Sequence, residues 1–296
     1  MSCSVLVLMG GPDEEHDVSV NSGRAVAEAL RAAGHRVHEQ VIERIHASQL
    51  DTFDHDVVFP VLHGAWGEGG ALQRELDAAG SRYVGSGPNA ATTAMDKDAT
   101  KTLAVQLGVP TPAWELLHDG DPCTMPSPVV VKAPREGSSI DLFICHDEEE
   151  RARRIKELTR RHRSIMVEQY VAGRELTVGV VLGEAMPIIE IIPATDSYDY
   201  EAKYLRDDTS YVLDPELNDD DREACLDAAV RLGTAIGCRD LWRADFMLDD
   251  RGPWLLELNT MPGFTSHSLL PKAAAHAGRP MERLCHDLVE HALQRA

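Results

Sequence analysis

Three residues with oxygen-bearing side chains lie close together near the carboxyl end of the sequence, in two apolar segments. Asp245 lies two residues after Arg243, and Glu257 and Asn259 precede a Pro-Gly turn. Residues i and i+2 of a strand face the same side, so Glu257 and Asn259 are expected to project together. Two carboxylates and an amide are hard oxygen ligands of the kind that Mg²⁺ prefers. The group therefore predicts a magnesium site, although each residue taken alone is consistent with an ordinary strand end.

A lysine and a small, flexible loop form a second candidate group. Lys132 ends an apolar segment that begins at Pro128, and Arg-Glu-Gly-Ser-Ser follows at 135–139. An ammonium group and the backbone N–H groups of such a loop both suit phosphate oxygens. No Gly-x-x-x-x-Gly-Lys-Ser/Thr pattern occurs, so this is not a P-loop, and a Gly-Ser-Ser turn is by itself only a loop. Lys97, on an expected helix over 96–107, is by itself equally consistent with a solvated residue.

A third candidate group lies where an apolar segment ends in carboxylates, at Glu168 and Glu175. The backbone of such a strand end could read the edge of an adenine ring, and Glu175 could accept hydrogen bonds from ribose hydroxyls. Gly173 lies between the two, so a plain strand end followed by a turn explains the same residues equally well. From the residues alone, both interpretations stay open.

The elements expected to position these groups alternate at first between strands and helices. Val5–Met9 is a continuous apolar run, which is typical of a buried parallel strand. A helix with apolar residues over 20–30 follows and has a stop signal at Gly34. Strands at 37–41 and 57–62 continue the alternation. This order predicts a doubly wound α/β sheet, which binds ligands at the carboxyl ends of its strands.

The pattern then changes twice, first to a small α+β block and then to a new sheet. The expected elements are strands at 128–132, 165–168, 176–182, 186–192, 243–248 and 254–258, helices at 148–161 and 219–236, and a polar loop at 195–209. We therefore expect boundaries near residues 95 and 173, which give three domains over residues 1–95, 96–173 and 174–296.

The composition narrows the classes of function. The 29 basic and 49 acidic side chains leave a net charge of −20, which argues against sequence-independent binding of nucleic acid because such proteins displace counterions with basic residues. No stretch approaches the roughly 18 apolar residues of a membrane helix, and the start lacks the basic region of a signal peptide. The six cysteines form no Cys-x-x-Cys pair, so neither a zinc site nor a disulfide framework is expected. We expect a cytoplasmic protein that does not bind membranes.

Seven short motifs, in order along the chain, resemble those of the ATP-grasp superfamily and, more narrowly, of the D-alanine–D-alanine ligases. The resemblance extends from Val5 to about Ala277. The motifs are Gly-Gly-x-x-x-Glu15-x-x-Val-Ser, Leu-His63-Gly, Gly-Ser-Gly at 85–87, Met-Asp-Lys97, Arg-Glu-Gly-Ser138-Ser, Tyr-Asp-Tyr-Glu-Ala-Lys203-Tyr204 and Asn259-Thr-Met-Pro-Gly263-Phe-Thr-Ser-His-Ser268-Leu269. The resemblance implies a three-domain ATP-grasp architecture with α/β and α+β parts and an N-terminal Rossmann-like domain.

The resemblance also implies a reaction and its nucleotide. Ligases of this family join two D-alanines to D-alanyl-D-alanine, a peptidoglycan precursor, through a D-alanyl phosphate that forms with ATP. By resemblance, Lys97 and Lys132 contact the phosphates of ATP, Glu168 and Val171 lie by the adenine, and Glu175 holds the ribose. The three oxygen-bearing residues named first would hold two Mg²⁺ ions, for which Mn²⁺ could substitute.

Further residues are implied to act on the amino acids. Arg243 and the backbone N–H of Gly263 would stabilise the oxyanion of a tetrahedral intermediate. Glu15 would hold the ammonium group of the first D-alanine, with His63 nearby. These roles follow from the resemblance to the family and from no spacing of the residues themselves.

The second D-alanine and the closing loops complete the implied site. Ser268 and Leu269 would line the second subsite, and the loop with Lys203 would contact substrate. Ser138 and Tyr204 would form a hydrogen-bonded link with the glutamate of the first subsite and close the loops, which keeps water from the acyl phosphate.

Some positions leave alternatives open. Ligases that make D-alanyl-D-lactate carry Phe where this chain has Tyr204, and Leu269 is consistent with a methyl-bearing acceptor. Both favour D-alanine over D-lactate, D-serine or another amino acid. A nucleotide-binding protein without catalysis is the alternative from another class, and the family suggests a homodimer.

Asp141 departs from the family, which usually has glycine there. A carboxylate at this position either weakens the grip on the triphosphate or points outward. Asp tolerates left-handed backbone angles better than most residues, so we expect the fold to accept it.

Overall fold

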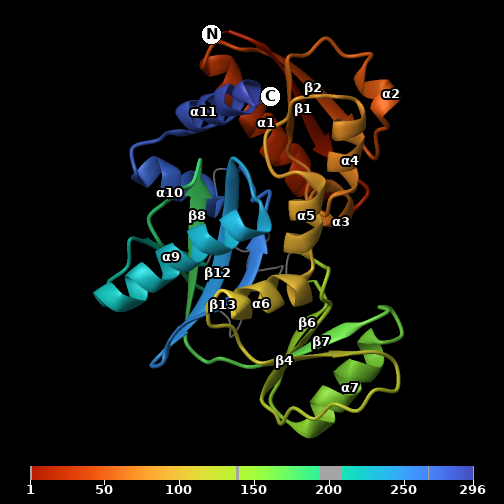
Figure 1. Cartoon of the computed structure of the whole chain (residues 1–296), viewed down its shortest axis with the longest axis vertical. Coiled ribbons are helices and arrows are strands. Elements are labelled where there is room, and N and C mark those ends of the chain that lie inside the picture. The colour runs from red at the N-terminus through yellow and green to blue at the C-terminus, as the bar shows by residue number, and fades with distance from the viewer. Residues whose placement is uncertain (1, 138–139, 194–208, 266, 296) are drawn as a thin grey trace.

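The computed structural model describes residues 2–137, 140–193, 209–265 and 267–295. Three sheets follow one another along the long axis of the molecule (Figure 1). The strands are β1 (Ser4–Gly10), β2 (Arg36–Ile42), β3 (Val57–Pro60), β4 (Trp114–Leu117), β5 (Val129–Lys132), β6 (Leu142–Cys145), β7 (Ile165–Gln169), β8 (Arg174–Val181), β9 (Glu184–Ala185), β10 (Ile189–Ile192), β11 (Ser210–Leu213), β12 (Leu241–Asp249) and β13 (Gly252–Asn259). The helices are α1 (His16–Ala32), α2 (Ala47–Leu50), α3 (Gly64–Gly67), α4 (Ala71–Ala78), α5 (Pro88–Met95), α6 (Lys97–Gln106), α7 (Glu148–Leu158), α9 (Asp219–Ile236), α10 (Leu269–His276) and α11 (Met281–Gln294). Among the described helices, none has the length and hydropathy to cross a membrane.

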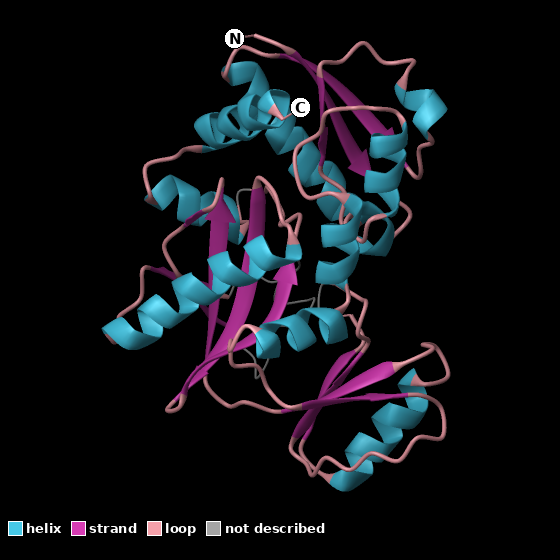
Figure 2. Ribbon diagram, in the orientation of Figure 1, coloured by secondary structure: helices cyan, strands magenta, loops and turns pink. Residues whose placement is uncertain are grey.

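The first sheet is parallel and has the strand order β2-β1-β3. Successive side chains of β1 point to opposite faces, and all are buried. Val5, Val7 and Met9 pack in one core with α1 and α11, whereas Leu6 and Leu8 pack in another with α4. Helices thus cover both faces of the sheet (Figure 2), as expected for a doubly wound α/β unit.

The turn after β1 requires glycine. Gly10 has φ +99°, and a Cβ on it would lie 2.5 Å from the carbonyl oxygen of Ile42, so a side chain would be both strained and obstructed. The turn leads to Glu15 and the start of α1. His63 follows β3. Both residues therefore lie at the carboxyl edge of the parallel sheet, where such folds bind ligands.

The second and third sheets are antiparallel. The second has the order β4-β7-β5-β6, and Leu158 of α7 packs on it. The third has the order β11-β10-β8-β12-β13, with β9 on β8, and Ala229 and Leu232 of α9 pack on one of its faces. Each sheet thus buries one face under a helix, so its opposite face can serve a site.

Several expected elements differ from the observed ones. The expected strand at 186–192 is wrong at its start, because Pro187 follows β9 and β10 begins at Ile189; proline lacks the N–H that a sheet ladder needs. The expected helix at 148–161 ends at Leu158, and the expected strand at 57–62 ends at Pro60. The short strands β4, β6 and β11 were not anticipated.

Helix α11 returns to the first sheet and packs on α1 (Figure 1). Asp240, whose side chain is 0% exposed, joins the same regions. It accepts hydrogen bonds from the backbone N of Gly85 at 2.6 Å and from His291 Nδ1 at 2.7 Å, and it pairs with Arg295. Asp240 therefore ties α11 to the segment that contains Gly85.

Candidate active site

The face of the third sheet opposite α9 carries a polar group on β12 and β13. Arg243 is paired with Asn259 across the two strands, and Asp245 with Glu257. Strand alternation puts these four side chains on one face, while Phe246 points to the other face and is buried in the core with α9. The structure thus brings together the four residues that the sequence singled out first.

Asp245 is held in a fixed orientation by two neighbours. Arg243 donates from Nε to Oδ1 at 2.9 Å and from Nη2 to Oδ2 at 2.8 Å. Thr177, which is registered opposite Asp245 on β8, donates from Oγ1 to Oδ1 at 2.6 Å. A bidentate guanidinium–carboxylate pair has a defined geometry, so the Arg243 head group is also fixed on this face of the sheet.

Glu257 and Asn259 complete the oxygen donors. Glu257 Oε2 lies 3.0 Å from Lys97 Nζ, and Asn259 Oδ1 accepts a hydrogen bond of 2.8 Å from the backbone N of Met261. In the described part of the chain, no group of three or more His, Cys, Asp or Glu side chains is placed to hold a metal ion. The candidate set consists instead of two carboxylates in cross-strand register and one amide on the same face, and this donor chemistry fits Mg²⁺.

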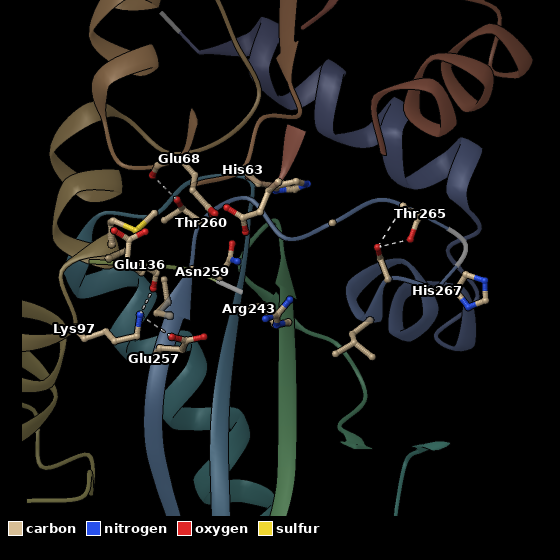
Figure 3. Close-up of a pocket in the computed structure, with 18 residues that line it drawn as sticks. His63, Glu68, Lys97, Glu136, Arg243, Glu257, Asn259, Thr260, Thr265 and His267 are labelled. Atoms are coloured by element: carbon tan, nitrogen blue, oxygen red, sulfur yellow. Dashed lines mark hydrogen bonds and ion pairs between the residues drawn. The ribbon is translucent and has the colours of Figure 1, made fainter. Parts of the chain in front are cut away.

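A pocket lies between this face and the carboxyl edge of the first sheet (Figure 3). It gathers residues from five segments of the sequence, at 15, 63–68, 94–97, 136–137 and 243–269. Of the residues expected for catalysis or substrate binding, those that line it are Glu15, His63, Arg243, Gly263, Ser268 and Leu269, and the expected phosphate ligand Lys97 and metal ligands Glu257 and Asn259 line it as well.

His63 enters the pocket as a neutral side chain. Burial lowers its pKa to about 4, and the charge of Arg243 lowers it as well, whereas a hydrogen bond with the Met261 carbonyl oxygen opposes the shift. His63 Nδ1 lies 3.1 Å from that oxygen. Because a carbonyl oxygen only accepts, Nδ1 carries the proton and Nε2 presents a lone pair.

Glu68 is a pocket residue that sequence reasoning missed. It is buried, and its Oε1 accepts a hydrogen bond of 3.2 Å from the backbone N of Gly64. Burial raises its pKa well above the usual value, and the charge of Glu15 raises it further, against the opposing effect of Arg243. One signal in the sequence could have identified Glu68, since this carboxylate lies about one helical turn after His63-Gly64, which follow the end of a strand.

The loop after β13 folds tightly over the pocket. A Cβ on Gly263 would lie 2.7 Å from Ser268 Oγ, so any larger residue would displace that hydroxyl. Ser268 Oγ accepts a hydrogen bond of 2.9 Å from the backbone N of Thr265. The backbone N of Phe264 donates to Ser22 Oγ of α1 at 3.1 Å. The loop is thus fixed both internally and against α1.

A larger cleft, of about 710 Å³, lies between the second and third sheets. Strands β5, β6 and β7 contribute to its lining, as do β8, β10, β12 and β13. Apolar side chains such as Leu142 and Met247 are mixed with charged ones. The residues expected to bind the nucleotide or metal that line it are Lys97, Lys132, Glu168, Val171, Glu175, Asp245 and Glu257.

Two lysines share one buried carboxylate at the side of this cleft. Glu168 is 2% exposed; its Oε1 lies 2.8 Å from Lys132 Nζ and its Oε2 lies 2.5 Å from Lys101 Nζ. Burial would raise the pKa of Glu168, but the charges of Lys132 and Lys101 outweigh burial, and the pKa is lowered. The sequence placed Lys101 on a helix but gave no sign of this contact.

The pocket and the cleft meet at residues that line both, Lys97, Glu136 and Glu257. Lys97 Nζ donates to the carbonyl oxygen of Glu136 at 2.7 Å in addition to its contact with Glu257. A reactant in the pocket and one in the cleft would therefore approach each other beside a carboxylate and an ammonium group.

Asp141 points toward the segment that follows α7. Its Oδ1 lies 2.9 Å from Arg161 Nη1 and its Oδ2 lies 2.6 Å from His162 Nε2. Its φ of 53° is in the left-handed region that glycine favours. Of the two expectations for this residue, the contacts favour an outward carboxylate. Three other predicted residues, Ser138, Lys203 and Tyr204, lie outside the described residues.

Comparison with known proteins places this chain among ligases. Residues 107–290 match the family model described as D-ala D-ala ligase C-terminus. The chain is 42% identical to the D-alanine–D-alanine ligase of Syntrophotalea carbinolica over 95% of its length and 93% of the relative. It is 38% identical to the enzyme of the same name from Aquifex aeolicus, over 95% and 97%. The crystal structure of D-alanine–D-alanine ligase from Bacillus anthracis complexed with ATP superposes with a TM-score of 0.87, at 28% identity over 99% of this chain and 98% of that one.

The fold is the mixed parallel and antiparallel architecture of ATP-grasp ligases. The match covers nearly all of the chain and of its relatives. The chain belongs to the D-alanine–D-alanine ligase family.

Proposed function

We propose that this protein is an ATP-dependent ligase that joins two D-alanines to D-alanyl-D-alanine, for peptidoglycan precursor synthesis in the cytoplasm. The observation that carries the proposal is the meeting of two cavities at Lys97 and Glu257. The reaction requires a nucleotide and two small amino acids to reach one phosphorus from different sides. A large cleft that joins a polar pocket supports that arrangement.

ATP occupies the cleft in this proposal. Its phosphates contact Lys97 and Lys132, because ammonium groups neutralise phosphate oxygens. The adenine lies by Glu168 and Val171 at the end of β7, and Glu175 accepts hydrogen bonds from the ribose hydroxyls. The ATP complex of the Bacillus anthracis ligase supports a nucleotide in this fold.

Asp245, Glu257 and Asn259 would hold two Mg²⁺ ions, or Mn²⁺ in their place. When bound, these ions neutralise the charge on the transferred phosphoryl group. The protein itself contributes the orientation of the donors, since Arg243 and Thr177 both fix Asp245.

In the first step, the carboxylate of one D-alanine attacks the γ-phosphorus of ATP, and ADP leaves. Glu15, which is buried beside the pocket, holds the ammonium group of this D-alanine. His63 is neutral and so adds no positive charge that would oppose this binding. The product of the step is D-alanyl phosphate.

In the second step, the amine of the other D-alanine attacks the activated carbonyl carbon. The carbonyl oxygen becomes an oxyanion, which Arg243 and the backbone N–H of Gly263 stabilise, and collapse of the intermediate expels phosphate and leaves a peptide bond. The Ser268 hydroxyl receives the carboxylate of the second D-alanine, and Leu269 contacts its methyl group.

We also propose the domain organisation and the oligomeric state. The strands of the three sheets fall within 4–60, 114–169 and 174–259, which supports three domains over residues 1–95, 96–173 and 174–296. A homodimer is proposed on the family resemblance.

The proposed ligase activity is tested by measuring phosphate release from ATP in the presence of Mg²⁺. D-alanine, L-alanine and a mixture of D-alanine and D-lactate are compared as substrates. We expect release with D-alanine and little with L-alanine, and a product with the mass of D-alanyl-D-alanine. An ester with D-lactate as the main product would instead indicate a depsipeptide ligase. No phosphate with any substrate would contradict the proposal and favour a binding protein.

A further inference from the structure

A buried lysine, Lys101, contacts the carboxylate of Glu168 at the side of the cleft. Lys101 on α6 is 0% exposed. Its Nζ lies 2.5 Å from Glu168 Oε2, donates to Thr111 Oγ1 at 2.5 Å, and lies 5.1 Å from the centre of the Trp114 ring. A buried ammonium group is costly unless it is paired and hydrogen-bonded. Lys101 therefore has polar partners that compensate its burial, and its charge acts on the neighbouring Glu168 and, through it, on Lys132.

The three charged groups carry one positive charge in excess. Lys101 and Lys132 contribute two positive charges, and Glu168 contributes one negative charge. Lys132 lines the cleft, whereas Lys101 is enclosed and contacts the other oxygen of the carboxylate. The carboxylate is thus neutralised from the protein side, and the excess charge faces the cleft through Lys132.

Removal of Lys101 would change this balance. Glu168 would then face Lys132 alone, and the two would form a neutral pair. Charges interact strongly at short range in a partly buried site, so the potential that phosphate oxygens meet near Lys132 would become much less positive.

We propose that Lys101 is a positioning residue that neutralises Glu168 and so leaves Lys132 with a net positive charge for the phosphates of ATP. The inference rests on the proposed function in one respect, since it takes Lys132 as a phosphate ligand. It adds Lys101, which does not line the cleft, to the residues that determine the affinity for ATP.

The same arrangement makes nucleotide binding depend on pH. Burial lowers the pKa of Lys101 to about 8, and Lys132 lowers it too, whereas Glu168 raises it. These are the charged groups that bear on its ammonium from β7 and β5; Thr111 and Trp114 are uncharged. As pH rises through 8, Lys101 loses its proton, Glu168 pairs with Lys132 alone, and affinity for phosphates falls.

Binding of ATP and of adenosine to Lys101→Met, with Mg²⁺ present, tests the inference. Adenosine lacks phosphates, so it reports the base and ribose subsites alone. We expect the Kd for ATP to rise at least tenfold and the Kd for adenosine to stay within twofold. Lys156→Met is the matched control, because it removes a positive charge from an exposed position on α7, and it should bind ATP as the wild type does.

A double variant separates the charge effect from a structural one. Lys101→Met combined with Glu168→Gln removes both members of the inner pair and leaves Lys132 cationic. Because Glu168 also lies by the adenine in the proposed function, its loss affects ATP and adenosine alike, so the ratio of the two Kd values is compared. We expect this ratio to recover to within about threefold of the wild-type ratio, and a ratio no better than that of Lys101→Met would overturn the inference.

Wild-type protein keeps the inference testable even if Lys101→Met fails to fold. Its Kd for ATP should rise between pH 7.5 and 9.5 while its Kd for adenosine stays constant; equal pH dependence for both ligands would contradict the inference. A wild type that binds no ATP at any pH would contradict the proposed function itself. Normal ATP binding by a folded Lys101→Met would contradict only the role of Lys101.

Discussion

The pocket and the cleft share Lys97 but differ in the other buried ionisable groups beside them. The pocket contains the carboxyl groups of Glu15 and Glu68 around one fixed guanidinium, Arg243. The cleft carries a lysine pair that exceeds its shared carboxylate by one positive charge, between partly apolar walls. The first composition suits small cationic groups such as ammonium, and the second suits a planar base with phosphates.

This difference in buried groups determines which ligands each cavity binds. Buried groups of one sign disfavour ligands of the same sign, because repulsion is screened least where solvent is excluded. We expect changes in the pocket to act on the amino acids and the chemical step, and changes beside the cleft to act on the nucleotide.

Arg243→Ala should give the largest effect. It removes a proposed oxyanion donor and leaves Asp245 without two hydrogen bonds, so we expect kcat for phosphate release to fall by roughly 10²- to 10³-fold. Arg251→Ala is a matched control, since Arg251 also pairs with an aspartate two residues away but is exposed. Its kcat should equal that of the wild type. If Arg243→Ala folds and its kcat stays within threefold of the wild-type value, the proposed catalytic role of Arg243 is wrong.

His63→Asn should change how stability depends on pH. The native pKa of His63 is about 4, and that of histidine in an unfolded chain is about 6.5. Between these values the unfolded chain binds a proton that the native pocket does not, so stability is lost as pH falls from about 6.5 toward 4. The loss assigned to His63 between pH 7 and pH 5 is about 2 kcal/mol.

Urea unfolding of the wild type, His63→Asn and the control His38→Asn at pH 5 and pH 7 measures this difference. His63→Asn should lose about 2 kcal/mol less than the wild type, whereas His38→Asn, at an exposed position, should lose as much. Equal losses in all three proteins would show that the pocket does not exclude the proton.

Asp141→Gly should give the smallest effect. Its carboxylate contacts Arg161 and His162, and its backbone already has a conformation that glycine favours. The KM for ATP should stay within about twofold, and the free energy of unfolding should change by at most about 1 kcal/mol, as is usual for partly exposed ion pairs. Asp141→Asn is the control for charge alone. A fall in KM of tenfold would place the negative charge within reach of the triphosphate.

Local patterns predicted the longer elements of the fold. Helix α9 occupies the expected residues because Asn218 caps its first turn and Gly237, at φ 87°, ends it. The four-residue strands β4, β6 and β11 give no such signal, since each is too short to show a period and pairs with a separate segment of the chain. Such strands are defined by tertiary contacts more than by propensity.

The same distinction applies to the site. A period of two on β13 was sufficient to place Glu257 and Asn259 on one face. It could not reveal the burial of Glu68 or the contact of Lys101 with Glu168, because both depend on how separate sheets pack. The other site residues were predicted only from the resemblance to the family. The orientation of the Asp141 carboxylate could be read only from the structure.

The return of α11 to the first sheet has a consequence for biosynthesis. Leu284, Leu288 and Val289 of that helix share a core with Val5 and Val7 of β1. A ribosome releases β1 long before α11, so one side of that strand stays incompletely covered until α11 emerges. Truncation near residue 280 would therefore leave this side of the first sheet uncovered.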